Sequence, residues 1–180
     1  MRGEVCIKGA ARVTRASDLR PEKPITVMEA AEIGIPRRHM LRVAELFMDG
    51  APELLRLYAA DCADLVRDVA GDAHRGNLHT MIDTARRVAL GETWPDALPL
   101  TRGMIPPGVS GEVSDVYEFA RLALADDPAE AAQGGNLKAN QIGRRLTQRT
   151  VSTPGEVARM TGDIDRVLTY LLTRYDWTAV

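Results

Sequence analysis

The chain has 180 residues, of which 45% are hydrophobic and 27% are charged, and its formal net charge is −2. This composition excludes a disordered or fibrous chain and is typical of a globular protein with one ordinary core or two small ones. The small negative net charge argues against a wholly basic nucleic-acid binder, but the charges are unevenly distributed. Residues 1–45 carry nine Lys or Arg and six acids, whereas the remaining 135 residues carry 14 bases and 19 acids.

Cysteine usage and hydropathy limit where the protein acts. The two cysteines, Cys6 and Cys62, provide neither a disulfide framework nor a CxxC metal site. No apolar run approaches the ~20 residues of a membrane span, and the first residues lack the apolar core of a signal peptide. We therefore expect a cytoplasmic protein with no membrane partner.

Residues 1–23 form the first predicted region, a basic N-terminal arm with a short strand at residues 4–8. Its cations stand among Gly, Ala and Ser residues and are Arg2, Lys8, Arg12, Arg15, Arg20 and Lys23. Such a segment is either a solvated tail or an arm that follows a phosphate backbone.

Residues 24–72 are predicted to be a helix-turn-helix DNA-binding domain. Thr26 and Glu29 form a capping box for a first helix that ends at Gly34, and Pro36 suits the first turn of a second helix. The predicted core stripe of that second helix is Met40, Val43, Ala44 and Phe47. The side chains expected to face outward at its start are Arg37, Arg38, His39 and Arg42.

Residues 73–180 are predicted to be a helical domain that carries a dimerisation surface. Apolar periodicity predicts helices at residues 51–70, 77–89, 112–125, 155–160 and 163–175, with a short helical turn at 128–133 that Gly134 and Gly135 end. Asn77 is the expected cap of the helix at 77–89. Residues 91–111 contain four prolines and four glycines, so they are expected to be irregular, either as an interdomain linker or as a packed loop.

These patterns together predict an all-α fold, a helix-turn-helix followed by a bundle-like C-terminal part. The dense apolar face of the last helix suggests either a core or a dimer seam. Because paired half-sites multiply the specificity of a DNA binder, we expect a homodimer through the later helices.

A second basic segment covers residues 136–149 and contains no acid. Its cations are Lys138, Arg144, Arg145 and Arg149, which are candidate contacts to the DNA backbone. Residues 153–172 have the pattern of a second, degenerate helix-turn-helix. Since its second helix begins with Asp163 and Asp165, we expect it to brace the basic segment instead of contacting phosphate.

The sequence AAEIGIPRRHMLRVAELFMDGAPELLRLY, residues 30–58, resembles the helix-turn-helix region of ParB/Spo0J-type partition and plasmid-maintenance proteins. The shared features are an Ala-Ala-Glu helix, a Gly-Ile-Pro-Arg-Arg turn and a Gly-Ala-Pro-Glu-Leu step into the next helix. The resemblance implies DNA binding by Arg37, Arg38, His39 and Arg42. The chain lacks the Gly-Glu-Arg-Arg nucleotide motif of that family, so we expect no CTP binding and no cofactor.

Catalytic and metal-binding patterns are absent from the sequence. No GxxxxGK[ST], GxGxxG, GxSxG or HExxH occurs. His74 and His79 are five residues apart, which does not place them on one helix face, so no metal site is expected. The sequence therefore predicts a non-catalytic, sequence-specific binder of double-stranded DNA, either a transcriptional regulator or a plasmid or phage maintenance factor. The alternative is a helical protein-protein adaptor that does not bind DNA.

Overall fold

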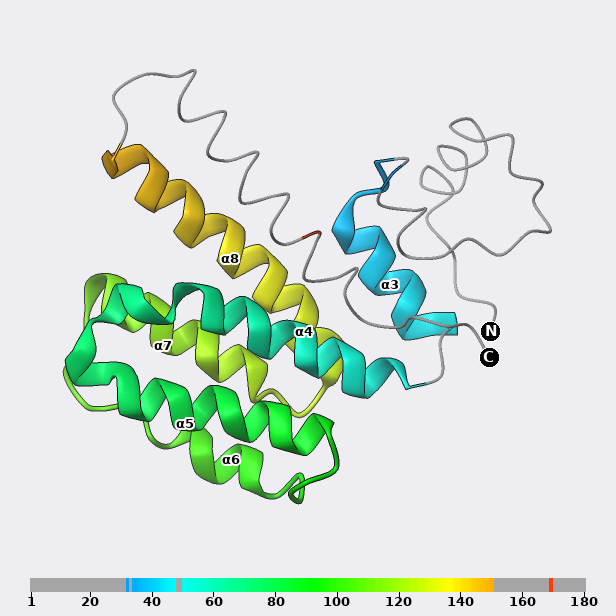
Figure 1. The fold of residues 1–180 in the computed structure, drawn as a ribbon, viewed down its shortest axis with the longest axis horizontal. Coiled ribbons are helices and arrows are strands. Elements are labelled where there is room, and N and C mark those ends of the chain that lie inside the picture. The colour runs from blue at the N-terminus through cyan, green and yellow to red at the C-terminus, as the bar shows by residue number, and fades with distance from the viewer. Residues whose placement is uncertain (1–31, 33, 48–49, 151–168, 170–180) are drawn as a thin grey trace.

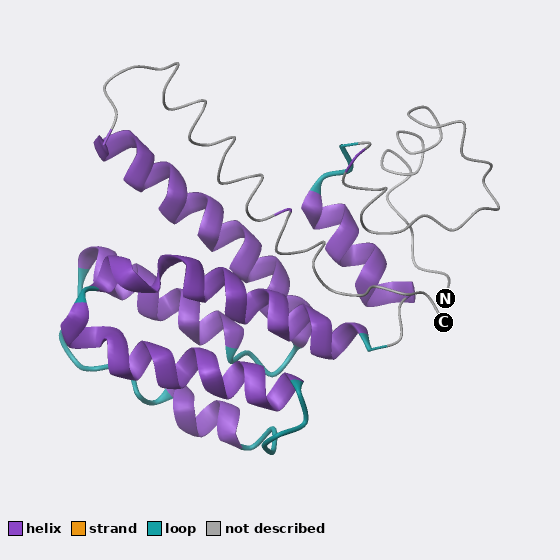
Figure 2. Ribbon diagram, in the orientation of Figure 1, coloured by secondary structure: helices purple, strands orange, loops and turns teal. Residues whose placement is uncertain are grey.

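The computed structural model describes residues 32, 34–47, 50–150 and 169, and in this part of the chain helices are joined by turns and loops, with no strand (Figures 1 and 2). Its elements are α3 (Arg37–Phe47), α4 (Ala51–Val66), the 3-10 helix η1 (Arg67–Ala70), α5 (Asp72–Ala89), α6 (Ala97–Arg102), α7 (Gly111–Ala123) and α8 (Pro128–Thr150). The predicted all-α fold is confirmed for these residues. None of the described helices is both long enough and apolar enough to span a membrane.

Several predicted features lie outside the described residues. They are the basic arm at 1–23 with its strand, the first helix of the predicted helix-turn-helix apart from Glu32, the second helix-turn-helix at 153–172, and the last helix apart from Thr169.

Helix α4 is the centre of the bundle, because α8, α5 and α7 all pack against it (Figure 1). The face of α4 toward the core carries Leu55, Tyr58, Cys62 and Val66, all buried, as the apolar stripe predicts. Leu65, the neighbour of Val66, is 47% exposed. The start of α4 follows Gly50, whose φ of 72° is a left-handed conformation that glycine adopts without steric cost.

Helix α8 runs without interruption through Gly134 and Gly135, so the predicted helix end at these glycines is wrong. Both glycines lie at a helix crossing. A Cβ at Gly134 would stand 3.0 Å from the Leu122 side chain, and one at Gly135 would stand 3.5 Å from the Ala59 Cα. The missing side chains allow α8 to approach α7 and α4 closely, so here the glycines serve packing instead of chain termination.

Helix α5 begins at Asp72, five residues earlier than predicted, and so the expected domain boundary between residues 72 and 73 coincides with the start of a core helix. Asn77 is therefore inside α5 and does not cap it; its Nδ2 donates to the Met104 carbonyl oxygen at 3.4 Å. Residues on both sides of this point, such as Leu55 and Leu78, belong to one buried cluster.

The Pro- and Gly-rich segment at 91–111 contains a short helix, α6, which the sequence did not predict. Pro99 is its third residue, where a missing N–H costs no helical hydrogen bond. Leu98 and Thr101 are buried, so α6 packs on the bundle as a structured crossing. Trp94 and Leu100 of the same segment are exposed.

Candidate nucleic-acid interface

The chain turns sharply between Glu32, which is helical, and the start of α3. Gly34 adopts a φ of 75°, and the Pro36 carbonyl oxygen accepts hydrogen bonds from the N–H groups of His39 (2.8 Å) and Met40 (3.3 Å). Together with α3, Glu32 and this turn are the part of the predicted helix-turn-helix that the structure describes. The first turn of α3 is thus fixed as the sequence predicts, beginning at Arg37.

Arg37 faces the protein interior, and the prediction that it faces outward is wrong. Its residue surface is only 8% exposed. The guanidinium donates from Nε to Asn136 Oδ1 at 2.9 Å and from Nη1 to Thr169 Oγ1 at 3.1 Å. The physical reason is periodicity, because Arg37 precedes the buried residues Met40, Leu41 and Ala44 at helical spacings of three, four and seven.

Asn136 connects this arginine to the centre of the bundle. Its Oδ1 also accepts a hydrogen bond at 3.0 Å from the hydroxyl of Tyr58, a residue of α4 with no exposed surface. Burial holds the pKa of Tyr58 well above its usual value and raises the pKa of the neighbouring Cys62 thiol to about 12. Arg37, Asn136 and Tyr58 therefore form a buried polar junction between α3, α8 and α4.

The other predicted cations at the start of α3 are more accessible. Arg38 is exposed, its Nε donates to His39 Nε2 at 3.4 Å, and it has no carboxylate partner among the described residues. The Arg42 side chain is 58% exposed and forms an ion pair with Glu45, one turn further along the helix. His39 is partly exposed. The accessible basic group of α3 is therefore Arg38, His39 and Arg42.

The basic segment at 136–149 forms the greater part of α8. Lys138 is an ion-pair partner of Asp115 on α7, with 3.2 Å between Nζ and Oδ1, and its side chain is only 21% exposed. Because this pair occupies the ammonium group, Lys138 is less suited to a phosphate contact than predicted. The backbone at Arg144, Arg145 and Arg149 continues the helix toward its C-terminal end.

Two hydrogen bonds attach the start of α3 to the start of the acid-free stretch of α8. Arg37 donates to Asn136, and Gln133 Nε2 donates to the Arg38 carbonyl oxygen at 3.3 Å. The two basic segments, about 100 residues apart in sequence, thus meet at one junction. A hollow of about 440 Å³ lies there, lined by Gly34, Ile35, Pro36, Arg37, Arg38, Asn136 and Thr169.

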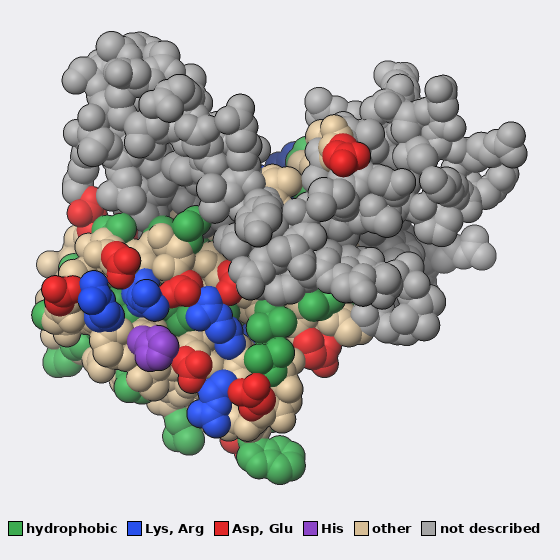
Figure 3. All heavy atoms as spheres, viewed as in Figure 1, with side chains coloured by type: hydrophobic (Ala, Val, Ile, Leu, Met, Phe, Trp, Pro, Cys, Tyr) green, Lys and Arg blue, Asp and Glu red, His purple; other side chains and the backbone are tan. Residues whose placement is uncertain are grey.

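Arg86, an arginine of α5, has carboxylate partners within the bundle. Arg86 donates to the buried carboxylate of Asp61 at 2.7 Å and to Asp64 at 2.8 Å. Burial lowers the pKa of Arg86, but its hydrogen bonds to these carboxylates outweigh that effect and raise it. Figure 3 shows Lys and Arg side chains intermixed with Asp and Glu over the bundle, in contrast to an accumulation of one sign.

The histidines provide no metal site in the part of the chain that the structure describes. His74 Nδ1 lies 3.3 Å from the Tyr117 hydroxyl, and the two rings are in edge-to-face contact. Among the described residues, no three His, Cys, Asp or Glu side chains come together as metal ligands. His74 thus has a packing role.

The sequence patterns do not identify Asn136 and Tyr58, which hold the junction. A tyrosine hydroxyl needs a partner when it is buried, and that requirement is the signal that could have identified Tyr58. No local sequence pattern identifies Asn136 as a residue of the junction. Comparisons of the chain with protein-family models, with curated proteins and with solved structures found no match.

Proposed function

We propose that this protein binds double-stranded DNA without catalysis, with the start of α3 toward the base edges and the C-terminal half of α8 along the phosphate backbone. In a helix-turn-helix, the N-terminal residues of the second helix contact bases while neighbouring elements contact phosphates. Arg38, His39 and Arg42 are the proposed base or phosphate contacts on α3. The resemblance of residues 30–58 to ParB-type proteins supports the same assignment.

One observation carries the proposal: the junction of α3 with α8 brings two basic segments into contact. Arg37 and Gln133 hold the first turn of α3 against α8 at the point where its acid-free stretch begins. From Asn136 to Arg149, a helix rise of 1.5 Å per residue gives a length of about 20 Å. A basic helix of this length spans several phosphates of one DNA strand, which follow one another at about 3.4 Å along the DNA axis.

Arg37 has a different role in this proposal from the one predicted from the sequence. Because its guanidinium is buried and bonded to Asn136 and Thr169, it positions α3 and does not contact DNA. We further propose that two copies act together, as two-fold symmetric readers of paired half-sites do, in a regulatory or maintenance role.

The test is retention of duplex DNA by the full-length chain, using fragments of its source genome. We expect selective retention of particular fragments, with an affinity that falls steeply between low and moderate salt, because each phosphate contact releases a counterion. Replacing Arg144, Arg145 and Arg149 together with Gln should weaken binding to all duplexes and reduce the salt dependence. If no duplex is retained even at low salt, the DNA proposal is wrong, and the protein-protein adaptor becomes the better account.

A further inference from the structure

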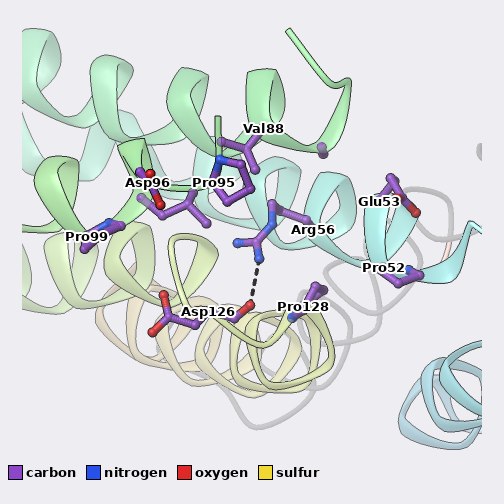
Figure 4. A pocket seen from close by; sticks show the side chains of 11 residues that line it. Pro52, Glu53, Arg56, Val88, Pro95, Asp96, Pro99, Asp126 and Pro128 are labelled. Carbon is purple, nitrogen blue, oxygen red and sulfur yellow. Dashed lines mark hydrogen bonds between the residues drawn. The ribbon is translucent and has the colours of Figure 1, made fainter. Parts of the chain in front are cut away.

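A groove in the bundle shares no lining residue with the hollow at the α3–α8 junction. The groove has a volume of about 370 Å³ and lies where α4 begins, α5 ends, α6 begins and the α7–α8 loop passes (Figure 4). Its apolar lining consists of Pro52, Val88, Ala89, Pro95, Leu98, Pro99 and Pro128. Proline rings have fixed φ angles, so much of this lining is rigid before any partner arrives.

Three of the most exposed large apolar residues adjoin this lining in the sequence. Trp94 is 82% exposed and precedes Pro95, Leu100 is 78% exposed and follows Pro99, and Leu90 is 58% exposed and follows Ala89. Isolated surface leucines need no explanation, but a tryptophan and two leucines that are sequence neighbours of one groove's lining favour an interaction surface.

The charge around the groove is negative. Glu53 and Asp96 line it, both are exposed, and neither forms an ion pair with a described residue. The one cation within the lining is Arg56, and Figure 4 shows it between these two carboxylates. A ligand therefore meets two carboxylates, Glu53 and Asp96, that have no cationic partner among the described residues, and a third, Asp126, that is paired with Arg102.

Arg56 does not supply an anion site here, because backbone carbonyls already hold its guanidinium. The guanidinium donates to the carbonyl oxygens of Ala123 (3.1 Å), Ala125 (2.7 Å) and Asp126 (3.2 Å). These groups close the C-terminal end of α7, where helix carbonyls lack partners within the helix. The side chain is 5% exposed, and burial lowers its pKa. The function of Arg56 is thus to hold the α7–α8 corner that forms one wall of the groove.

We propose that this groove binds a basic peptide segment of a partner protein. Apolar side chains of the peptide would lie on the proline-lined floor and against Trp94, and its Lys or Arg side chains would face Glu53 and Asp96. The indole of Trp94 also provides a surface on which a cation can stack. Because carboxylates repel phosphates, this surface is distinct from the proposed DNA interface and extends the function beyond it.

A second copy of the chain is a less suitable occupant. A two-fold contact through this face would bring another set of the same carboxylates into the interface, where like charges disfavour association. A basic segment instead neutralises both carboxylates while it covers the tryptophan.

The experiment is a selection of binders from a random-peptide phage library on the folded full-length chain. We expect the recovered peptides to combine Lys or Arg with Leu, Ile or Phe. A synthetic copy of one such peptide should bind the Trp94→Ala chain about thirty-fold more weakly than wild type, the loss typical of a central interface tryptophan. Glu53→Gln with Asp96→Asn should weaken binding by about fivefold and reduce its salt dependence.

Matched controls are Leu65→Ala, an exposed leucine at the other end of α4, and Asp72→Asn, an exposed carboxylate at the start of α5; both should bind the peptide like wild type. Recovery of no peptide, of acidic peptides, or of peptides insensitive to Trp94→Ala would overturn the proposal. So would a wild-type dimer in sedimentation that Trp94→Ala converts to monomer, because the occupant would then be a second copy. Duplex retention should not change in Trp94→Ala, so failure of this proposal is separable from failure of the DNA proposal.

Discussion

Arg86 in the bundle and Arg38 at the start of α3 are both helix arginines, but their surroundings differ. Arg86 binds Asp61 and Asp64 at hydrogen-bond distance, whereas Arg38 is exposed and has no carboxylate partner among the described residues. Arg56, also in the bundle, is held by three carbonyl oxygens. Arg56 and Arg86 thus hold elements of the bundle together, while the accessible face of α3 presents Arg38 and Arg42 outward.

At the α3–α8 junction, one helical turn contains both a buried arginine that holds helices together and an exposed arginine. Arg37 is buried and bonded to Asn136, and the adjacent Arg38 points to solvent. The difference teaches that a run of basic residues is not one functional unit. One of its members positions the helix, and the next is available to a ligand.

The largest effect is expected for Arg56→Met, which tests whether bundle arginines are structural. Removing the guanidinium leaves buried carbonyl oxygens of Ala123 and Ala125 without donors, so we expect the free energy of unfolding to fall by about 3 kcal/mol. Urea denaturation measures the change. Arg87→Ala, on the exposed face of α5, is the control and should change it by less than about 0.5 kcal/mol. Equal effects of the two variants would remove the distinction between structural and surface arginines.

Arg37→Met tests whether the junction holds α3. We expect a loss of about 1–2 kcal/mol, because the variant removes hydrogen bonds from a charged donor while Asn136 keeps its bond from Tyr58. Combined with Asn136→Ala in a double-mutant cycle, it should show a coupling of about 1 kcal/mol. Hydrogen exchange of the α3 amides should accelerate in Arg37→Met. Additive effects of the two substitutions would contradict a direct link between α3 and α8.

The free energy of unfolding at alkaline pH tests whether the Cys62 thiol, which neighbours Tyr58 of the junction, is buried. Burial raises the pKa of this thiol from 9.0 to about 12 in the folded chain, so the unfolded chain releases its proton first as the pH rises. The buried neutral thiol makes its full contribution to the free energy of unfolding below pH 9. This contribution is lost between pH 9 and 12, with a slope of about 1.4 kcal/mol per pH unit. Cys62→Ala should lack this component. Parallel pH profiles of wild type and variant would show that the thiol is not buried as described.

The helices of the bundle were predictable because their apolar residues recur at helical spacing. Val116, Tyr117, Ala120 and Leu124 define the buried face of α7, and the structure confirms them as buried. Gly134 and Gly135 were misinterpreted, since glycine both ends helices and allows helices to cross closely. The two roles can be told apart only from Ala59 and Leu122, which lie close to these glycines in space but not in the sequence.

The candidate site was predictable in position but not in detail. The Gly34–Pro36 turn and the start of α3 follow from local residues, whereas the burial of Arg37 depends on whether the stripe that begins at Arg37 faces the bundle. The stripe through Arg37, Met40, Leu41 and Ala44 has the same spacing as the one first assigned through Met40, Val43, Ala44 and Phe47. Asn136 enters the site through tertiary packing alone, so no sequence pattern identifies it.

The most direct test of the central claim is duplex-DNA affinity of the full-length Arg38→Ala/Arg42→Ala chain, measured on the fragment that wild type binds best. The proposal predicts a loss of at least about tenfold with no measurable change in the free energy of unfolding, since both side chains are largely exposed. Arg75→Ala/Arg87→Ala, which removes the same charge from α5, should retain most of the affinity. Wild-type affinity in the α3 variant would contradict the assignment of the accessible face of α3 as the DNA-binding surface.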